Sequence, residues 1–156
     1  MTEDQKAVSE LLLRAETIAR VAHYTQKNAV TGAPYIGHVE RVVAAVEGEE
    51  AKAVAWLHDV AEDSDIGFPA MLAAGIPQRI VDAVALLTRT RGSDYSAYID
   101  NVKASRNPLA LAVKVADLYD HLTPSCLERL RPRYEAALVE LGAPPQPTTP
   151  HEDERK

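Results

Sequence analysis

Apolar residues recur three and four positions apart along almost the whole chain, and the strict alternation that marks a β-strand is nearly absent. In the segment that begins at Pro77, for example, Ile80, Val84 and Leu87 share one face of a helix. This pattern predicts an all-α protein whose amphipathic helices bury their apolar faces against one another. A chain of 156 residues is long enough for one such domain and too short for two. The expected fold class is a single-domain helical bundle.

Turn and cap residues divide the chain into successive helices. Thr2 can cap the first helix, and Asn107 followed by Pro108 is typical of a helix start. The expected helices cover approximately residues 3–22, 36–47, 49–61, 69–74, 77–87, 95–104, 109–122 and 132–141. The domain is expected to span residues 1–142, and the proline-rich, charged tail of residues 143–156 is expected to be disordered.

The net charge of −6 and the single cysteine restrict the partners and the compartment. No run of basic residues offers a surface for a nucleic-acid polymer, which is therefore not an expected partner. Cys126 stands alone, which excludes an intrachain disulfide and fits a reducing compartment. The sequence has neither a signal-peptide pattern nor the roughly 20 apolar residues of a membrane helix, so a soluble, cytoplasmic protein without a membrane partner is expected. Apolar faces on the helices of Val42 or Tyr134 are candidate homo-oligomer contacts.

The segment Leu57–Asp63 gathers negative charge beside a histidine. His58 lies on the apolar face of its helix. Asp59, Glu62 and Asp63 follow at spacings of three and four and share a neighbouring face. The C-terminal end of a helix repels each carboxylate by a few tenths to about 1 kcal/mol, and a bound cation would remove this conflict. His and Asp suit a divalent transition metal, but a solvated acidic helix end with one buried histidine explains this segment equally well.

Asp117 is the second sign of a metal site. It lies in the segment 109–118, which is apolar except for Lys114 and Asp117 and is therefore expected to be buried. An ion pair between these two residues contributes only about 0.2–0.5 kcal/mol on an exposed helix, too little to justify burial. A metal ligand is the better interpretation, and the ion pair stays open as the alternative. His38 follows a tight turn and, taken alone, is more often a surface or core histidine than a ligand.

Together these residues resemble a known family. A histidine, a His-Asp pair and a distant aspartate in this order are similar to the HD superfamily of metal-dependent phosphohydrolases. More closely, the chain resembles the hydrolase domain of RelA/SpoT-type enzymes and the stand-alone small alarmone hydrolases, which remove pyrophosphate from the 3′ position of (p)ppGpp. Five blocks between about residues 15 and 122 carry the resemblance: Ala22–Gln26, Gly32–His38, Leu57–Asp63, Leu87–Thr88 and Val113–Asp117.

The resemblance implies an HD-domain fold and a role for particular residues. It implies four ligands of one divalent metal: His38, His58, Asp59 and Asp117. The metal in this branch of the family is usually manganese, and the residue types also accept iron, zinc or cobalt. Glu62 and Asp63 are implied to act on the attacking water as general base and orienting group. For Asp63 a helix-ending carboxylate remains the alternative.

Four further residues are candidate substrate contacts: Lys27, Thr88, Lys114 and His121. Lys27 lies near the positions of a basic pair of the family, but out of register with it. Thr88 could equally end a helix, and Lys114 could equally pair with a neighbouring carboxylate. His23 is expected to be a structural histidine or to support a ligand.

Two departures from the family alter the nucleotide pocket. RelA/SpoT-type hydrolases carry an Arg-Lys pair where this chain has Ala29 and Val30. After the last ligand they read Arg-Leu-His-Asn, whereas residues 118–121 here read Leu-Tyr-Asp-His, and His121 is the candidate replacement for the Asn.

The expected function is that of a metal-dependent phosphohydrolase acting on a small nucleotide-like substrate. It would cleave a phosphate ester or a pyrophosphate group, like a (p)ppGpp 3′-pyrophosphohydrolase with an altered base pocket. The first alternative is a catalytically idle HD module that binds a nucleotide or a partner for regulation. A plain helical interaction domain is the third hypothesis, and it predicts that Asp59→Ala and Asp117→Ala do not lower stability.

Overall fold

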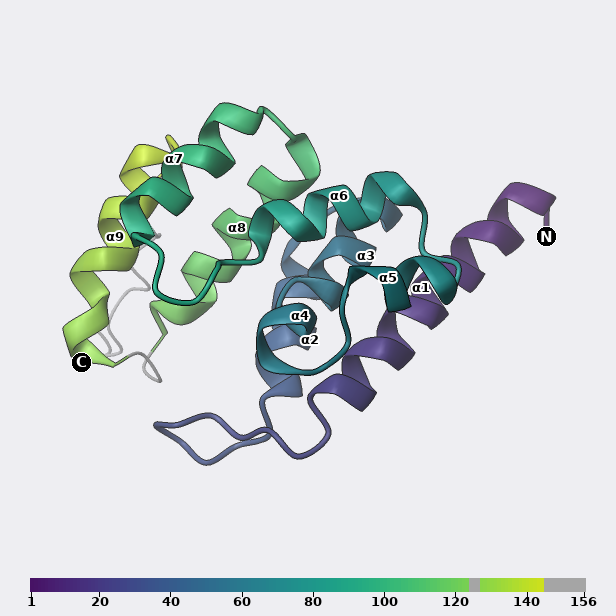
Figure 1. Cartoon of the computed structure of the whole chain (residues 1–156), viewed down its shortest axis with the longest axis horizontal. Helices are drawn as coiled ribbons and strands as arrows, with labels where there is room; N and C mark the ends of the chain where they lie inside the picture. Colours follow the sequence, from purple (N-terminus) through teal and green to yellow (C-terminus); the bar gives the residue numbers. More distant parts are fainter. Residues whose placement is uncertain (124–126, 145–156) are drawn as a thin grey trace, which may run out of the picture.

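Helices account for most of residues 1–123 and 127–144, the part of the chain that the computed structural model describes (Figure 1). The helices are α1 (Glu3–Ala22), α2 (Ile36–Ala45), α3 (Glu49–Leu57), α4 (Val60–Asp63), α5 (Phe68–Ala73), α6 (Gln78–Leu87), α7 (Tyr95–Ser105), α8 (Pro108–His121), the 3₁₀ turn η1 (Glu128–Leu130) and α9 (Arg131–Glu140). The described residues hold no strand beyond one bridge pair, Lys27 with Pro34, so the predicted all-α fold is confirmed. The predictions for Cys126 and for the tail from residue 145 onward lie outside the described residues.

Side-chain caps set where two helices begin, as the sequence predicts. Thr2 Oγ1 accepts a hydrogen bond from the Gln5 backbone N–H at 3.1 Å, and Gln5 Oε1 accepts one from the Thr2 N–H at 2.8 Å. Asn107 Oδ1 accepts from two backbone N–H groups at the start of α8, at 3.0 and 3.1 Å, and Pro108 is the first residue of that helix. Both caps satisfy backbone donors that a helix start leaves unpaired.

One predicted helix is interrupted. The apolar pattern favours a single helix over residues 49–61, but α3 ends at Leu57 and α4 begins at Val60. Asp59, between them, has φ −109° and ψ 0°, which lies outside the α-helical region. In a continuous helix, adjacent side chains point about 100° apart, whereas the break turns His58 and Asp59 toward one site. Leu57 and Val60 are both buried and three positions apart, so the apolar spacing continues across the break without a sign of it.

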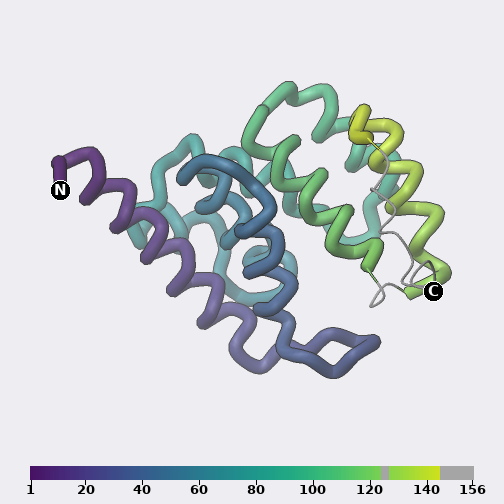
Figure 2. The backbone as a smooth tube through the Cα atoms, turned by 180° about the vertical axis from the view of Figure 1, so that it is seen from behind, coloured from purple at the N-terminus to yellow at the C-terminus, as the bar shows by residue number. Residues whose placement is uncertain are grey.

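Two hydrophobic clusters form the core, and α8 belongs to both (Figure 2). The larger surrounds α3, where every side chain from Ala51 to Leu57 except Lys52 is buried and where α1, α2, α6 and α8 pack. The smaller lies at the end of the molecule opposite the N-terminus and joins α7, α8 and α9. Its buried residues are Ile99, Leu118, Leu122, Ala137 and Leu138. Asp117 of α8 therefore lies where the two clusters meet.

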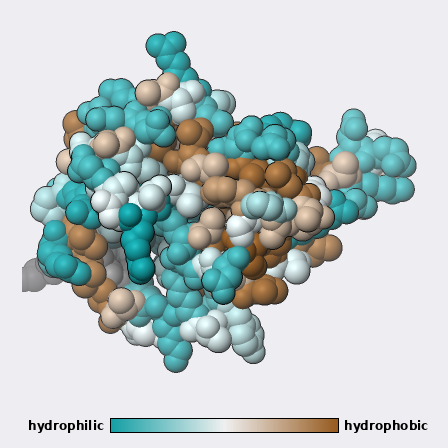
Figure 3. Space-filling view, in the orientation of Figure 1, coloured by the Kyte–Doolittle hydropathy of each residue, from teal (hydrophilic) through white to brown (hydrophobic). Residues whose placement is uncertain are grey.

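The surface tests two expectations about partners. In the described part of the chain, no helix combines the length and the apolar character needed to cross a membrane. Val42 itself is fully buried in the larger cluster, so its side chain adds nothing to an exposed face of α2. Val139 on α9 is 79% exposed, and apolar residues also gather over the half of the molecule that contains α4, α5 and α6 (Figure 3). A homo-oligomer stays a prediction.

Candidate metal centre and adjoining pocket

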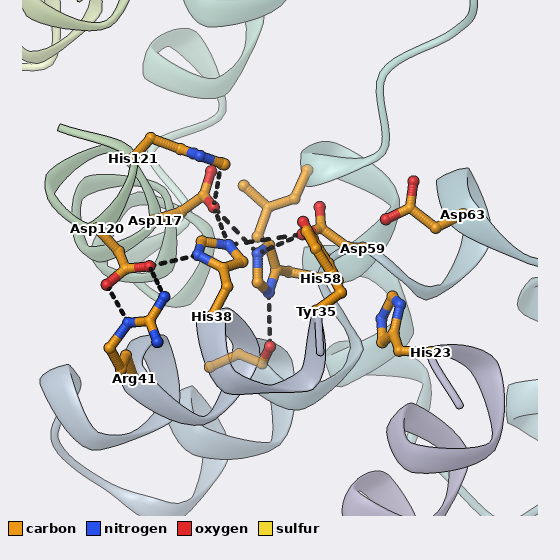
Figure 4. A network of polar contacts seen from close by, with 12 residues as sticks. His23, Tyr35, His38, Arg41, His58, Asp59, Asp63, Asp117, Asp120 and His121 are labelled. Atoms are coloured by element: carbon orange, nitrogen blue, oxygen red, sulfur yellow. Dashed lines mark hydrogen bonds and ion pairs between the residues drawn. The ribbon is translucent and has the colours of Figure 1, made fainter. Parts of the chain in front are cut away.

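Three parts of the fold bring the four candidate metal ligands together (Figure 4). α2 carries His38, and α8 carries Asp117. The break between α3 and α4 carries His58 and Asp59. One ligand atom from each of the four lies within 4.8 Å of the others. Because α2 and α3 both pack against α8, residues as much as 79 positions apart in sequence meet in this cluster.

Asp117 lies at the centre of the cluster. Its Oδ1 atom lies 2.9 Å from His38 Nε2 and 3.2 Å from His58 Nε2. Asp59 Oδ2 lies 3.0 Å from His58 Nε2 and 3.7 Å from His38 Nε2, and it accepts a hydrogen bond from the Tyr35 hydroxyl. Two imidazole nitrogens and two carboxylate oxygens therefore surround one point, with His38, His58 and Asp117 buried around it.

The outer imidazole nitrogens indicate what the inner ones can bind. His58 Nδ1 lies 2.6 Å from the backbone oxygen of Ala55, and His38 Nδ1 lies 2.6 Å from Asp120 Oδ2. Because both oxygens accept hydrogen bonds, we assign the proton to Nδ1, which leaves a lone pair on Nε2 of the neutral imidazole. Lone pairs on Nε2 and on carboxylate oxygens repel one another unless a proton or a metal ion lies between them. Two nitrogens and two oxygens are a suitable donor set for a divalent transition metal, so these residues fit one metal ion.

The electrostatics of the cluster also favour positive charge between the carboxylates. Burial lowers the pKa of His38, but hydrogen bonds to Asp117 and Asp120 outweigh burial and raise the pKa to about 9. Burial likewise lowers the pKa of His58, and the charge of Asp59 raises it well above its usual value. For Asp117, burial raises the pKa, and the ammonium of Lys114 is the main cause that holds it well below the usual range.

Lys114 and Asp117 form the ion pair that the sequence left open. Lys114 Nζ lies 2.9 Å from Asp117 Oδ2, with both side chains almost inaccessible to solvent. Both histidines lie against the other oxygen, Oδ1. The ion pair and a metal therefore use different oxygens of one carboxylate, and the two interpretations of Asp117 are compatible.

Glu62 and Asp63 of α4 line a pocket that opens from the cluster. Glu62 accepts a hydrogen bond from the backbone N–H of Arg89, and Asp63 Oδ2 accepts one from Gln26 Nε2 at 3.2 Å. Partial burial raises the pKa of each carboxyl group, and the charge of Asp59 adds to the rise. A raised pKa makes a carboxylate a better proton acceptor near neutral pH.

Another part of the pocket wall carries positive charge. It consists of Arg89, Lys114 and Arg133, which we call the cationic wall. All three lie over the ring of Tyr95, at 5.3, 6.0 and 4.9 Å from its centroid. Within the described residues, Arg89 and Arg133 form no ion pair, and Arg89 Nε and the Tyr95 hydroxyl are buried without a hydrogen-bond partner. Lys114 is expected from the sequence as a substrate contact, whereas Arg89 and Arg133 are not, because the three residues come from α8, from the loop after α6 and from α9.

His121, like Lys114, is a predicted substrate contact that lies against Asp117. It lines the pocket, and its Nε2 lies 3.2 Å from Asp117 Oδ1. Its ring stacks on His38 at 4.6 Å and on Tyr134 at 5.1 Å between ring centroids. Its position four residues after Asp117 on α8 accounts for this placement.

Lys27 and Thr88 do not line this pocket. Lys27 is exposed in the bridge pair with Pro34, and the Thr88 hydroxyl donates to the Val84 backbone oxygen at 2.8 Å, at the end of α6. His23 is buried, and its Nδ1 lies 2.7 Å from the oxygen of Gln26, the residue that donates to Asp63. His23 therefore contacts the residue that holds Asp63, and its expected role as a structural histidine or a support of a ligand stays a prediction.

Three residues of the network were missed, and each has a local explanation. Tyr35 lies inside a block that resembles the family, yet a phenol in a loop predicts no contact with Asp59. Asp120 follows Asp117 by one helical turn, a spacing that could have indicated a shared face. Arg41, which pairs with Asp120, follows His38 by the same spacing on α2.

These observations define an all-helical domain with a buried His/Asp cluster at the base of a polar pocket. The solved structure of a metazoan ortholog of SpoT has this fold, with a TM-score of 0.70 and 23% sequence identity over 84% of this chain and 83% of that chain. That protein is described as hydrolysing ppGpp and playing a role in starvation responses. The likeness confirms the fold that the resemblance to RelA/SpoT-type hydrolases implied. No family model and no curated protein matches the sequence.

Binding of a metal should raise the thermal stability of the protein. At a metal concentration one hundred times its Kd, binding stabilises the folded state by about 2.7 kcal/mol. For a chain of this length, we expect Tm to rise by about 5–10 °C with Mn²⁺, Fe²⁺, Co²⁺ or Zn²⁺. Ca²⁺, which takes six to eight oxygen ligands, is the matched control and should shift Tm little. Equal shifts with Ca²⁺ and Mn²⁺ in a thermal melt would contradict a site built from two imidazoles and two carboxylates.

Proposed function

We propose that this chain is a metal-dependent phosphohydrolase of the HD-domain type, which cleaves a phosphate ester or a pyrophosphate group from a small nucleotide-like molecule. One observation carries the proposal. The pocket that includes His58, Asp59 and Asp117 also includes two carboxylates suited to proton transfer and a cationic wall suited to phosphate oxygens. The sequence resemblance to RelA/SpoT-type hydrolases and the likeness in fold to a ppGpp-hydrolysing protein support it.

The proposed mechanism divides the chemistry among the residues of the pocket. The four-residue His/Asp cluster would hold one divalent metal, which we propose to be manganese. When bound, such a metal would polarise a phosphoryl oxygen and lower the pKa of a water. Glu62 takes the proton of the attacking water, because its carboxylate lines the pocket and has a raised pKa. Asp63, held by Gln26, orients that water.

The cationic wall is proposed to hold phosphate oxygens of the substrate. Phosphate accepts charge-assisted hydrogen bonds from guanidinium groups, often two at a time. The buried Arg89 Nε and the Tyr95 hydroxyl are donors without a partner in the described residues, and a bound phosphate would satisfy them. Arg133 has no ion pair there to give up before it binds an anion.

A second pocket, next to His38, is the proposed place for the base of a nucleotide. The loop between α1 and α2 lines it with Asn28, Thr31 and Pro34. The Arg-Lys pair that this loop carries in RelA/SpoT-type hydrolases is replaced by Ala29 and Val30. We therefore infer that the chain holds the base through different contacts, which makes its substrate preference differ from that of those enzymes.

Arg133→Met tests the proposed phosphate contact. Because a hydrogen bond to a charged group contributes about 1.5–3 kcal/mol, we expect KM to rise by about tenfold to a hundredfold, with kcat changed less. Steady-state kinetics in Mn²⁺ measure both constants. Arg91→Met is the matched control, since Arg91 is exposed, lies two residues beyond Arg89 and does not line the pocket. An equal rise in KM for the two variants would argue against a specific contact.

The experiment that tests the function is the release of phosphate and pyrophosphate from a panel of nucleotides, (p)ppGpp included, by protein loaded with Mn²⁺ or treated with EDTA. Release in Mn²⁺ that EDTA abolishes is the expected result. Pyrophosphate from (p)ppGpp would identify an alarmone hydrolase, and turnover of another nucleotide would identify the altered pocket as the source of specificity. Tight nucleotide binding without turnover would instead support a regulatory module, and no release from any compound would overturn the proposal.

A further inference from the structure

The outer ring nitrogen, Nδ1, of each histidine in the cluster is hydrogen-bonded to a different kind of group. His58 Nδ1 donates to the backbone oxygen of Ala55, a carbonyl of α3, at 2.6 Å. His38 Nδ1 donates to the side-chain carboxylate of Asp120, at 2.6 Å. A backbone carbonyl is fixed by its helix, whereas a side-chain carboxylate can rotate and needs a support of its own.

Arg41 provides this support for Asp120 (Figure 4). Its Nε donates to Asp120 Oδ1 at 2.7 Å, and its Nη2 donates to Asp120 Oδ2 at 3.1 Å. Such a two-point pair between guanidinium and carboxylate restricts rotation about the last bond of the aspartate. The Asp120 side chain is 11% exposed, whereas that of Arg41 is 56% exposed. An exposed arginine thus braces a buried carboxylate, which in turn contacts a candidate metal ligand.

We propose that Asp120 is a positioning residue of the metal centre, which holds the ring of His38 with its Nε2 directed at Asp59 and Asp117. A carboxylate behind a ligating histidine fixes the tautomer and the ring plane and makes the ligating nitrogen more basic. The proposal rests on the metal-dependent function proposed above. Asp120 also stands at one of the positions where this chain departs from the RelA/SpoT pattern. The hydrogen bonds of Asp120 to His38 and Arg41 are therefore a feature of this sequence and not of that pattern.

The competing explanation is that Asp120 only links α8 to α2 and so stabilises the fold. Both explanations use the same hydrogen bonds, so stability alone does not separate them, but metal affinity does. Titration calorimetry with Mn²⁺ should show about tenfold to a hundredfold weaker binding for Asp120→Asn, which keeps the size of the side chain and removes its charge. Asp120→Glu should recover part of the loss. The absorption spectrum of bound Co²⁺ should also differ between wild type and Asp120→Asn, because the orientation of one ligand differs.

The matched control is Asp100→Asn, since Asp100 is exposed on α7 and lines neither pocket. Tm in EDTA reports the stability of each variant. A lower Tm with wild-type Mn²⁺ affinity in Asp120→Asn would show a tie between helices and overturn the proposal. If Asp120→Asn does not fold, Arg41→Met decides instead, because that side chain is mostly exposed: we expect a smaller loss of affinity in the same direction, and no loss would overturn the proposal.

These readouts separate this inference from the proposed function. A wild-type protein that binds Mn²⁺ and hydrolyses no compound removes the enzymatic function and leaves the positioning role testable by affinity. A wild-type protein that binds no divalent metal overturns both.

Discussion

Asp59→Asn should lower the rate of phosphate or pyrophosphate release by at least about a thousandfold. Loss of one of the four proposed ligands would weaken metal binding, and metal-assisted phosphoryl transfer derives several kcal/mol of transition-state stabilisation from the ion. A loss of about 4 kcal/mol corresponds to three powers of ten in rate. Asparagine keeps the size of the side chain and can still accept the hydrogen bond from Tyr35, so the fold should persist. The measurements are kcat in saturating Mn²⁺ and the rise of Tm on adding Mn²⁺, and both should fall.

Asp65→Asn is the control for that variant. Asp65 lies six residues further on, is exposed and does not line the pocket, so its substitution removes the same charge from the same acidic segment. Wild-type activity in Asp65→Asn together with the loss in Asp59→Asn would separate ligation from overall charge. An Asp59→Asn protein that retains both its rate and its response to Mn²⁺ would remove Asp59 from the metal site.

Glu62→Gln should lower kcat by about a hundredfold to ten-thousandfold, the usual contribution of a general base. Glutamine can still accept the hydrogen bond from the Arg89 backbone, but it cannot take a proton from water. Because Glu62 is not among the four clustered candidate ligands, the affinity for Mn²⁺ and the rise in Tm should stay at wild-type values. This combination of lost rate and kept metal distinguishes Glu62→Gln from Asp59→Asn.

The control for the general base is Glu47→Gln, at an exposed glutamate between α2 and α3 that lines no part of the pocket. Its kcat should equal that of the wild type. A Glu62→Gln enzyme with a rate within a few-fold of wild type would show that another group, with Asp63 the nearest candidate, accepts the proton.

Most of the fold could be predicted from the sequence because helix formation leaves a local signal. The apolar spacing marks the helices, and the capping residues Thr2 and Asn107 mark where two of them begin. Each of these signals lies within a few neighbouring residues of the chain. The break at His58 and Asp59 was missed for the same reason, since the apolar spacing continues across it. The burial of Val42 in the larger cluster could not be predicted, because a stripe of apolar residues does not say which helix covers it.

The sequence by itself determined most of the helices, and its resemblance to a known family pointed to the four candidate metal ligands and the two carboxylates beside them. Only the tertiary structure decided how they meet and what surrounds them. The cationic wall unites three elements, and Asp120 reaches His38 only because α8 packs against α2. A local pattern reports neighbours along one helix, whereas a pocket is made where helices cross, and the crossing depends on the packing of side chains distant in sequence.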